Sequence, residues 1–395
     1  MDKPESPNGD GSVLVIIPGS VNYFYNQLGR RVAEAIRTLG CTVDVVPLCD
    51  VADADYDLCL VSNIYEVGFG YGDEAAAAVR LAEIRKRSGR MAAMGMESVG
   101  TNWYSHIYSV CDRTGVDRIL DFGLWNQTDY LLPDHRNKYQ FAFNGLTPSE
   151  VRQASAEPRH TERAFPWAFV GHQTHHRAAL VDYLIQAVDP GGFVYLPSLA
   201  PCAEKGSPHL NQQQYELVLA QTRYQVWCSH HAQFYVEVER FRASLLTGGV
   251  AIKVVESTAN IPERAPFREL MMTAHDLPHR LTVEQFPELR RRFQAEALGF
   301  PTLVQTMAEV LPTLGIRTGG DRARPLARTG RAGRTPRHRR LLARRVADAA
   351  APDRSSLLPR RLARDRLRGE RRFVGEPEPG VGPRPVSLHR VRGCG

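Results

Sequence analysis

Stretches with a helical hydrophobic period alternate with short apolar runs over most of the chain. Residues 13–17, VLVII, form an apolar run rich in β-branched side chains, which is typical of a buried strand. The next stretch, 26–40, carries its apolar residues at helical spacing and ends at Gly40. A second apolar run, 41–48, follows. This order of strand, helix and strand predicts a βαβ unit, whose two strands lie parallel in one sheet.

A second series of strands and helices begins after residue 166. Before it, the first series continues through strands predicted at 56–63 and 90–97, and we expect Gly89 to end the helix between them. Later strands are predicted at 168–171, 191–197, 224–230 and 248–255. The two series predict an α/β fold with two Rossmann-like doubly wound domains facing a cleft. Open α/β sheets bind ligands at the carboxyl ends of their strands.

The pattern stops near Ile316, where the composition also changes. Residues 317–395 hold 22 Arg, no Lys and 7 acidic residues, so the net charge of +7 comes from this tail, and residues 1–316 are net acidic. With Phe373 as its one aromatic residue, the tail cannot build a third core, and we expect it to be disordered. Two origins stay open: an Arg-rich arm that binds polyanions, or the product of a frameshift in a GC-rich gene.

Length and composition set further limits. With 395 residues and 43% apolar side chains, the chain can hold two sizeable cores. No apolar run approaches the roughly 20 residues of a membrane span, and the first residues form no signal peptide, so we expect a cytoplasmic protein. The seven cysteines form no CxxC pair and are expected to stay reduced. The predicted parts are a disordered segment at 1–11, domains at 12–160 and 161–316, and the tail at 317–395.

The loop after the first strand, PGSVNYFYNQLG, is a candidate anion site. Gly19 and Ser20 let a ligand approach the backbone where a strand turns into a helix, and the helix N-terminus attracts negative charge. The loop lacks the GxGxxG pattern and the chain lacks a Walker sequence, which disfavours dinucleotide or ATP binding. An ordinary tight turn explains the loop equally well.

Glu97 and His106 are candidates for acid–base chemistry. Glu97 follows a predicted strand and is trailed by two aromatic residues and then His106. A carboxylate or an imidazole held beside a hydroxyl group can act as a general base. The alternative is that Glu97 is a solvated or helix-capping acid and that His106 is an ordinary surface residue.

The segment 169–177, FVGHQTHHR, contains three histidines. No acidic residue or cysteine accompanies them at the spacing of metal ligands, so we predict no metal site. Arg177 at the start of the following helix favours a second loop that faces an anion. Surface imidazoles are the alternative reading.

The segment 227–257 carries the most information. Arg240 and Lys253 can neutralise a diphosphate group, and Glu239 can accept hydrogen bonds from a ribose. The alternative is that these residues are solvated charges at the ends of a helix and a strand. The other candidates in this segment are His230, Glu237, Gly248 and Gly249.

Residues 240–252, RFRASLLTGGVAI, resemble the pattern R-x-F-E-A-x-x-x-G-x-x-hydrophobic of GT-B glycosyltransferases, in particular of the group-1 family and its spore-coat-maturation-like branch. The stretch AFVGHQTHHRAALVDYL is similar to the strand and Arg-bearing helix that begin the nucleotide-sugar half of these enzymes. The resemblance spans about 165–256, and the first half matches only in architecture. It implies that the second domain binds a nucleoside-diphosphate sugar and the first a hydroxyl acceptor.

The resemblance also implies a metal-independent glycosyltransferase of the hexosyltransferase type, with the nucleotide sugar as co-substrate and no other cofactor. Glu97 or His106 would be the base if the reaction inverts. We expect no specific nucleic-acid partner, and peripheral contact with a membrane stays open. In this family the C-terminal helix crosses back onto the first domain, a role that falls to 287–311.

Ala243 departs from the family pattern. It stands where the family usually has the glutamate that binds the ribose of the nucleotide. Either Glu237 or Glu239 takes over that role, or donor binding is altered. The sequence therefore leaves two rival functions open: a catalytically degenerate binding or scaffold protein with the same fold, and polyanion binding through the basic tail.

Overall fold

The computed structural model describes residues 11–19, 22–156, 162–197, 210–230 and 234–318. The chain divides into two compact units, and the first of them contains all of these residues. The predicted tail lies outside the described residues except for 317–318, and so does the predicted N-terminal segment except for residue 11. Ser20 is also outside them.

The first half of the chain forms a six-stranded parallel sheet with the strand order β2-β1-β3-β4-β5-β7. Its strands are β1 Ser12–Ile17, β2 Thr42–Pro47, β3 Tyr56–Ser62, β4 Ser88–Gly95, β5 Arg118–Asp121 and β7 Tyr139–Phe141. The helices between them are α1 Tyr23–Thr38, α2 Ile64–Tyr71, α3 Glu74–Arg87 and α4 Asn102–Arg113. The apolar run predicted as a strand, 13–17, is buried. A parallel sheet covered by helices on both faces requires such continuous apolar strands.

The second half forms a five-stranded parallel sheet with the strand order β13-β12-β10-β8-β9. Its strands are β8 Phe165–Val170, β9 Phe193–Tyr195, β10 Thr222–Cys228, β12 Val250–Val254 and β13 Met271–Met272. The accompanying helices are α6 His175–Ala187, α7 Gln212–Ala220, α8 Val238–Leu246, α9 Leu277–Arg280 and α10 Phe286–Gly299. Together the two sheets confirm the predicted α/β fold with two Rossmann-like domains.

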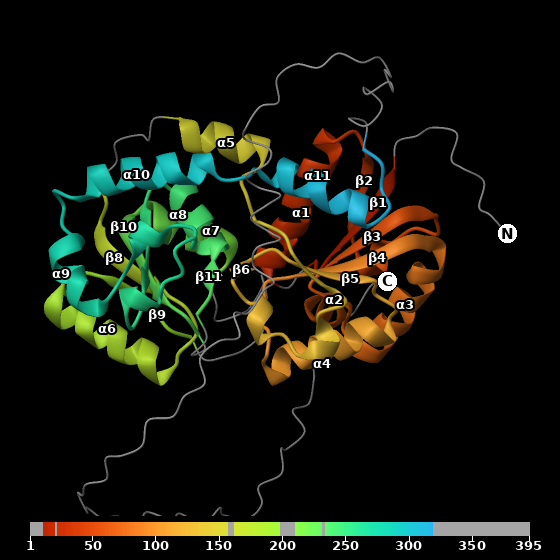
Figure 1. Ribbon diagram of the computed structural model, residues 1–395, viewed down its shortest axis with the longest axis horizontal. Helices are drawn as coiled ribbons and strands as arrows, with labels where there is room; N and C mark the ends of the chain where they lie inside the picture. Colours follow the sequence, from red (N-terminus) through yellow and green to blue (C-terminus); the bar gives the residue numbers. More distant parts are fainter. Residues whose placement is uncertain (1–10, 20–21, 157–161, 198–209, 231–233, 319–395) are drawn as a thin grey trace, which may run out of the picture. The chain divides into compact units, whose positions relative to one another are not determined.

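Two helices pack on the half of the molecule opposite to the one their place in the chain suggests. Helix α11, Leu303–Thr313, contributes Met307 and Leu311 to the core of the first sheet and lies beside α1 (Figure 1). Helix α5, Pro148–Ser155, contributes Ala154 to the core of the second sheet and packs on α8 and α10. The return of the chain onto the first half therefore runs through α11, at the end of the segment that the sequence assigned to this role.

Short elements complete the fold. Strands β6, Leu124–Trp125, and β11, Val236–Glu237, pair antiparallel and join the two halves. The 3-10 helices are η1 Leu48–Asp50, η2 Thr128–Tyr130, η3 Pro133–His135, η4 Thr258–Asn260, η5 Arg268–Leu270 and η6 Ala274–Asp276. None of the described helices combines the length and the apolar run that crossing a bilayer requires.

The prediction that Gly89 ends a helix is wrong. The helix α3 ends at Arg87, and Gly89 lies inside β4. A Cβ atom at this position would lie 2.7 Å from the carbonyl oxygen of Asp57 in β3. The glycine is therefore needed for the close approach of two strands, a requirement that the pattern along the sequence does not reveal.

Candidate functional site

Glu97 lies at the carboxyl end of the first sheet, just after β4. Its Oε1 atom accepts hydrogen bonds from the Tyr25 hydroxyl at 2.5 Å and from Asn63 Nδ2 at 3.2 Å. Burial raises the pKa of Glu97, and hydrogen bonds from Tyr25, Trp103 and Asn63 oppose this shift only in part. A carboxyl group whose pKa is raised is a stronger base when it ionises and is suited to proton transfer.

A second carboxyl group, Glu66, accompanies Glu97. Asn22 Nδ2 donates to Glu66 Oε1 at 3.0 Å. Burial raises the pKa of Glu66, and the nearby charge of Glu97 raises it further. Among the described residues neither carboxylate forms an ion pair with Lys or Arg, so this half of the site has an excess of acid.

Two asparagines in left-handed backbone conformations shape this end of the sheet. Asn22 has φ 44° and precedes α1, and Asn63 has φ 51° and precedes α2. The Asn63 side chain also caps α2, because its Oδ1 accepts from the backbone N–H groups of Tyr65 and Glu66. Asparagine tolerates this conformation better than most residues. Tyr25, Asn63 and Glu66 were not predicted from the sequence. Asn63, which stands directly after a buried strand, was the one with a signal in the sequence.

The structure does not bring His106 into contact with Glu97. The His106 side chain is 44% exposed and faces Glu74, with Nε2 3.7 Å from Oε1. Its ring stacks on Trp103, with 5.7 Å between the ring centroids, and Trp103 hydrogen-bonds to Glu97. His106 therefore adjoins the site through Trp103 and also through Tyr65, whose ring centroid is 6.0 Å from that of His106.

Gly19 lies in the loop between β1 and α1 with φ 79°, where a side chain would be strained. Its N–H donates to Asn26 Oδ1 at 3.0 Å, and Asn26 Nδ2 donates to its carbonyl oxygen at 2.6 Å. Asn26 on α1 thus holds the loop closed onto the helix. The neighbouring candidate Ser20 lies outside the described residues.

Three cations gather at the carboxyl end of the second sheet. Arg177, in the first turn of α6, donates to the carbonyl oxygens of His172 at 3.1 Å and of Cys228 at 3.0 Å. Arg240, on α8, donates to the carbonyl oxygen of Val170 at 2.9 Å. Because Val170 and Cys228 end β8 and β10, the two guanidinium groups stand at the same edge of the sheet.

Lys253 is the third cation, near the carboxyl end of β12, and its side chain is buried. Its Nζ donates to Ser229 Oγ at 2.6 Å and lies 4.2 Å above the ring centroid of Trp227. Burial lowers the pKa of Lys253 to about 8, although the charge of Glu237 opposes this shift. Cation–π contact with Trp227 offsets part of the cost of holding this charge away from water.

The charge of Glu237 acts on all three cations. It forms an ion pair with Arg240. Burial acts to raise the pKa of Glu237, but Arg240, Arg177 and Lys253 outweigh burial and lower it. Three positive groups thus share one negative group, which leaves an excess of buried positive charge.

Unpaired donors accompany this excess of positive charge. Arg177 is 3% exposed and Trp227 1% exposed, yet Arg177 Nε and Trp227 Nε1 have no hydrogen-bond partner in the described part of the protein. Buried donors without partners are costly and rare in native structures. A bound anion would offset the excess charge, so the cluster of Arg177, Arg240 and Lys253, called the cation cluster below, fits an anionic ligand.

The acidic and cationic parts lie within electrostatic reach of each other. The charge of Glu237 contributes to the raised pKa of Glu97. The backbone connects them too, because Glu237 pairs with Leu124 in the β6–β11 ribbon and the N–H of Val238 donates to the carbonyl oxygen of Gly123 at 3.0 Å. Glu97 therefore lies within electrostatic range of Glu237, the carboxylate that pairs with Arg240.

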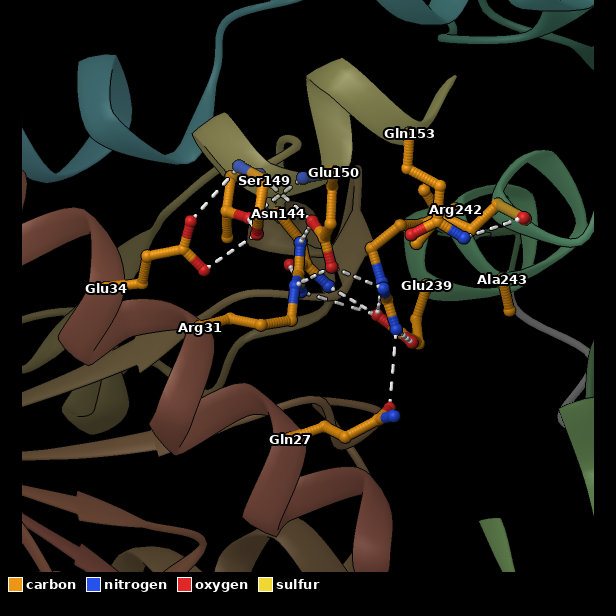
Figure 2. Close-up of polar contacts among 12 residues, drawn as sticks. Gln27, Arg31, Glu34, Asn144, Ser149, Glu150, Gln153, Glu239, Arg242 and Ala243 are labelled. Atoms are coloured by element: carbon orange, nitrogen blue, oxygen red, sulfur yellow. Dashed lines mark hydrogen bonds and ion pairs between the residues drawn. The ribbon is translucent and has the colours of Figure 1, made fainter. Parts of the chain in front are cut away.

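Glu239 is separate from the cation cluster. Its carboxylate accepts from Arg242 and from Asn144 Nδ2, the latter at 3.0 Å (Figure 2). Ala243 packs against the cluster of Tyr23, Tyr215 and Leu219. The carboxylate nearest to the cation cluster is therefore Glu237, and the role that the sequence gave to Glu239 stays a prediction without a contact to those cations.

Gly248 and Gly249 lie at the opposite end of the second sheet from the cation cluster. They precede β12, and a Cβ atom at Gly249 would lie 3.1 Å from the carbonyl oxygen of Thr222, the first residue of β10. Gly248 has φ 75° and ends α8. At about 3.3 Å per residue, β12 places Lys253 roughly 15 Å from these glycines. Their contact with the donor stays a prediction, and the cation cluster gives it no support.

His230 follows β10, close to the cation cluster. Its backbone N–H donates to the Tyr235 hydroxyl at 2.8 Å, which fixes the loop after the strand. Within the described ranges, no three His, Cys, Asp or Glu side chains gather in a way that could hold a metal ion.

Comparisons with known proteins give structural likenesses only. No protein-family profile matches the chain, and no curated protein sequence matches it. A structure of HepE from Anabaena with UDP and glucose has a TM-score of 0.47 at 11% identity, covering 77% of this chain and 99% of that one. An α-glucosyltransferase with UDP and a DNA 13-mer gives 0.49 at 10% identity, covering 77% and 99%. An α1,3-fucosyltransferase gives 0.40 at 10% identity, covering 80% and 93%. Because these scores lie below 0.5, we base neither fold nor function on them.

Proposed function

We propose that the protein is a glycosyltransferase that moves a sugar from a nucleoside-diphosphate donor to a hydroxyl acceptor. The observation that carries this proposal is the excess of positive charge at the carboxyl end of the second sheet, together with two buried donors that have no partner among the described residues. A diphosphate supplies the matching negative charge. The sequence resemblance of residues 240–252 to GT-B glycosyltransferases supports the same conclusion.

The cation cluster would act on the leaving group. As the bond between the anomeric carbon and the terminal phosphate oxygen breaks, negative charge grows on the diphosphate, and Arg177, Arg240 and Lys253 stabilise it. Stabilisation that increases in the transition state accelerates the reaction, whereas uniform binding does not. In this proposal the protein's own cations neutralise the diphosphate, so no metal ion is needed. Glu237 is the proposed candidate for the ribose contact that Ala243 cannot make.

Glu97 would act on the acceptor. The acceptor oxygen attacks the anomeric carbon while its proton passes to the Glu97 carboxylate, and the nucleoside diphosphate departs. This assignment is for a reaction that inverts the anomeric centre. The Tyr25 hydroxyl and Asn63 hold the Glu97 carboxylate in place through their hydrogen bonds. The raised pKa of Glu97 makes its carboxylate a stronger proton acceptor.

Calorimetric titration with UDP-, GDP- and dTDP-sugars tests the donor site. We expect one of them to bind, and Arg240→Ala to weaken that binding about 100-fold, because removing one member of a buried charged contact costs on the order of 2–5 kcal/mol. Arg291→Ala is the matched control, since Arg291 pairs with Glu288 on the exposed face of α10. Absence of binding by all three donors would contradict the proposal.

The rival function, a binding or scaffold protein without turnover, is favoured by one observation. Ala243 packs against an aromatic cluster in place of the glutamate of the related families. Such a protein would bind the nucleotide without consuming its sugar. Donor binding without release of nucleoside diphosphate, over a panel of hydroxyl acceptors and in water alone, would favour this rival.

A further inference from the structure

Helix α8 carries two interleaved ion pairs that point in different directions. Glu237 pairs with Arg240, and Glu239 pairs with Arg242, each three residues apart. Because a helix turns by about 100° per residue, Arg242 lies roughly 200° around the axis from Arg240. The first pair therefore faces the cation cluster, and the second faces α1 and α5 (Figure 2).

The carboxylate of Glu150 on α5 is shared between an arginine of each half. Arg31 of α1 donates to it through Nε at 2.8 Å and through Nη2 at 3.0 Å, and Arg242 of α8 donates through Nη1 at 2.6 Å. Glu150 also closes the capping box at the start of α5 by accepting from the N–H of Thr147. Its carboxylate is thus fixed from three sides.

Further bonds complete this network. Arg31 donates through Nη1 to Asn144 Oδ1 at 2.5 Å and through Nη2 to the carbonyl oxygen of Gly145 at 2.6 Å. Asn144 in turn donates to Glu239. Arg31, Arg242 and Glu150 are 7 to 8% exposed. With two arginines and two glutamates, the network is electrically neutral.

The network and the cation cluster therefore differ in kind, although α8 contributes to both. A neutral, buried network of mutually bonded groups has one good arrangement and is costly to disturb. The cation cluster instead retains excess positive charge, and within the described residues Arg177 Nε has no hydrogen-bond partner. Since Arg242 is tied to Glu150, the rotation and position of α8, and with them the place of Arg240, depend on α1 and α5.

We propose that Arg31 and Arg242 are positioning residues of the donor site. Through Glu150 they hold α8 at the angle that directs Arg240 and Glu237 towards the diphosphate. The proposal rests on the proposed function for the role of that site. Arg31 itself makes no described contact with Arg177, Arg240 or Lys253.

The test measures the affinity of the full-length protein for inorganic pyrophosphate. Arg31→Gln is expected to weaken binding at least tenfold, and Arg31→Lys, which keeps the charge near Glu150, is expected to restore part of it. The control is Glu34→Gln, because Glu34 joins α1 to Ser149 at the same junction but in an exposed position. Unchanged affinity in folded Arg31→Gln and Arg31→Lys would overturn the proposal.

A double-mutant cycle separates positioning from general destabilisation. If Arg31 acts through Arg240, then Arg31→Gln should have less than a twofold effect on pyrophosphate affinity in an Arg240→Ala background. An undiminished tenfold effect in that background would contradict action through Arg240. If Arg31→Gln does not fold, Arg31→Lys takes its place in the cycle.

Hydrogen exchange tests the same idea without any ligand. We expect Arg31→Gln to speed amide exchange in 236–246 by at least tenfold while exchange in β10 stays unchanged. Equal exchange in this segment would overturn the proposal. If the unaltered protein does not bind pyrophosphate, the proposed donor site is contradicted. The exchange result then still shows whether Arg31 holds α8 in place.

Discussion

The carboxyl ends of the two sheets carry opposite chemistry on the same scaffold. At the first sheet, Glu97 and Glu66 are partly buried, no cation in the described part of the chain pairs with them, and the pKa of each is raised. At the second sheet, cations outnumber the single carboxylate Glu237. Each end is an unfavourable arrangement in isolation, because buried charge of one sign is costly. The difference indicates that one end is suited to taking up a proton and the other to holding an anion.

The largest expected effect concerns the acidic end. Glu97→Gln should lower turnover about 1,000-fold, within the range that removal of a general base produces, and leave donor affinity within twofold. Steady-state kinetics with the donor identified by calorimetry measures both. Turnover within tenfold of the unaltered enzyme would show that Glu97 is not the base, and the proposed division of roles between the two sheets would be wrong. The control is Glu83→Gln, an exposed change on α3, which should leave turnover unchanged. Asn63→Asp is not suitable, because Asn63 contacts Glu97.

The next effect concerns the cationic end. Lys253→Met should weaken donor binding about 100-fold, in line with the loss of a buried charged contact, and should also raise the melting temperature, because it removes a buried charge whose ionisation folding disfavours. Calorimetry and thermal unfolding at pH 7 give the two results. Loss of stability together with unchanged binding would show that Lys253 has only a structural role.

The two ends also predict opposite pH dependences. Because the pKa of Lys253 is about 8, the affinity for UDP should fall as the pH rises through 8, up to tenfold per unit. The same shift makes the folded state gain stability between pH 8 and 10.5, the ordinary value for lysine, since the unfolded chain binds more protons there. Titrations of UDP from pH 6.5 to 9.5 test this, and Lys253→Met should show a flat profile over that range.

For Glu97 the sign is reversed. Its pKa lies above the ordinary value of 4.5, so the folded state holds a proton to higher pH than the unfolded chain does. Stability from this group is fully present below pH 4.5 and is lost as the pH rises through the folded pKa, whereas turnover should rise over the same range as the base ionises. Glu66→Gln removes a neighbouring negative charge and should move the acidic limb of the turnover profile to lower pH. An unmoved limb would show that the two carboxyl groups are not coupled.

The last prediction is that turnover does not depend on a divalent metal ion. If the cation cluster alone neutralises the diphosphate, turnover after exhaustive dialysis against EDTA should stay within twofold of the untreated enzyme. Adding back Mg²⁺ or Mn²⁺ should not raise it. A large loss that either ion restores would show that the cation cluster is insufficient and would assign part of its role to a metal.

The periodic pattern along the chain was enough to predict the sheets. Apolar runs such as 13–17 and 250–252 became buried parallel strands, because a parallel sheet covered on both faces needs continuous apolar residues. Strand ends then indicated Glu97, Arg177 and Lys253 as candidates. Gly248 and Gly249 precede β12 and therefore lie at its amino end, whereas open α/β sheets bind ligands at the carboxyl ends of their strands, so their contact with the donor stays a prediction.

The partners of each side chain could not be read from the sequence. Glu237 and Glu239 are two residues apart, and the sequence offered both for the same role. In the structure one faces the cation cluster, and the other faces Arg242 and Asn144. Arg31 and Glu150 are 119 residues apart and gave no signal at all.

The amino-acid sequence by itself determined the alternation of strands and helices, the two parallel sheets and the residue types at the strand ends, because these depend on local periodicity and on burial. Only the tertiary structure decided which charges share a site: the unpaired acids beside Tyr25, the cations around Glu237 and the neutral network through Glu150. The physical reason is that the energy of a buried charge depends on its neighbours within a few ångströms, and folding brings those neighbours from distant parts of the chain.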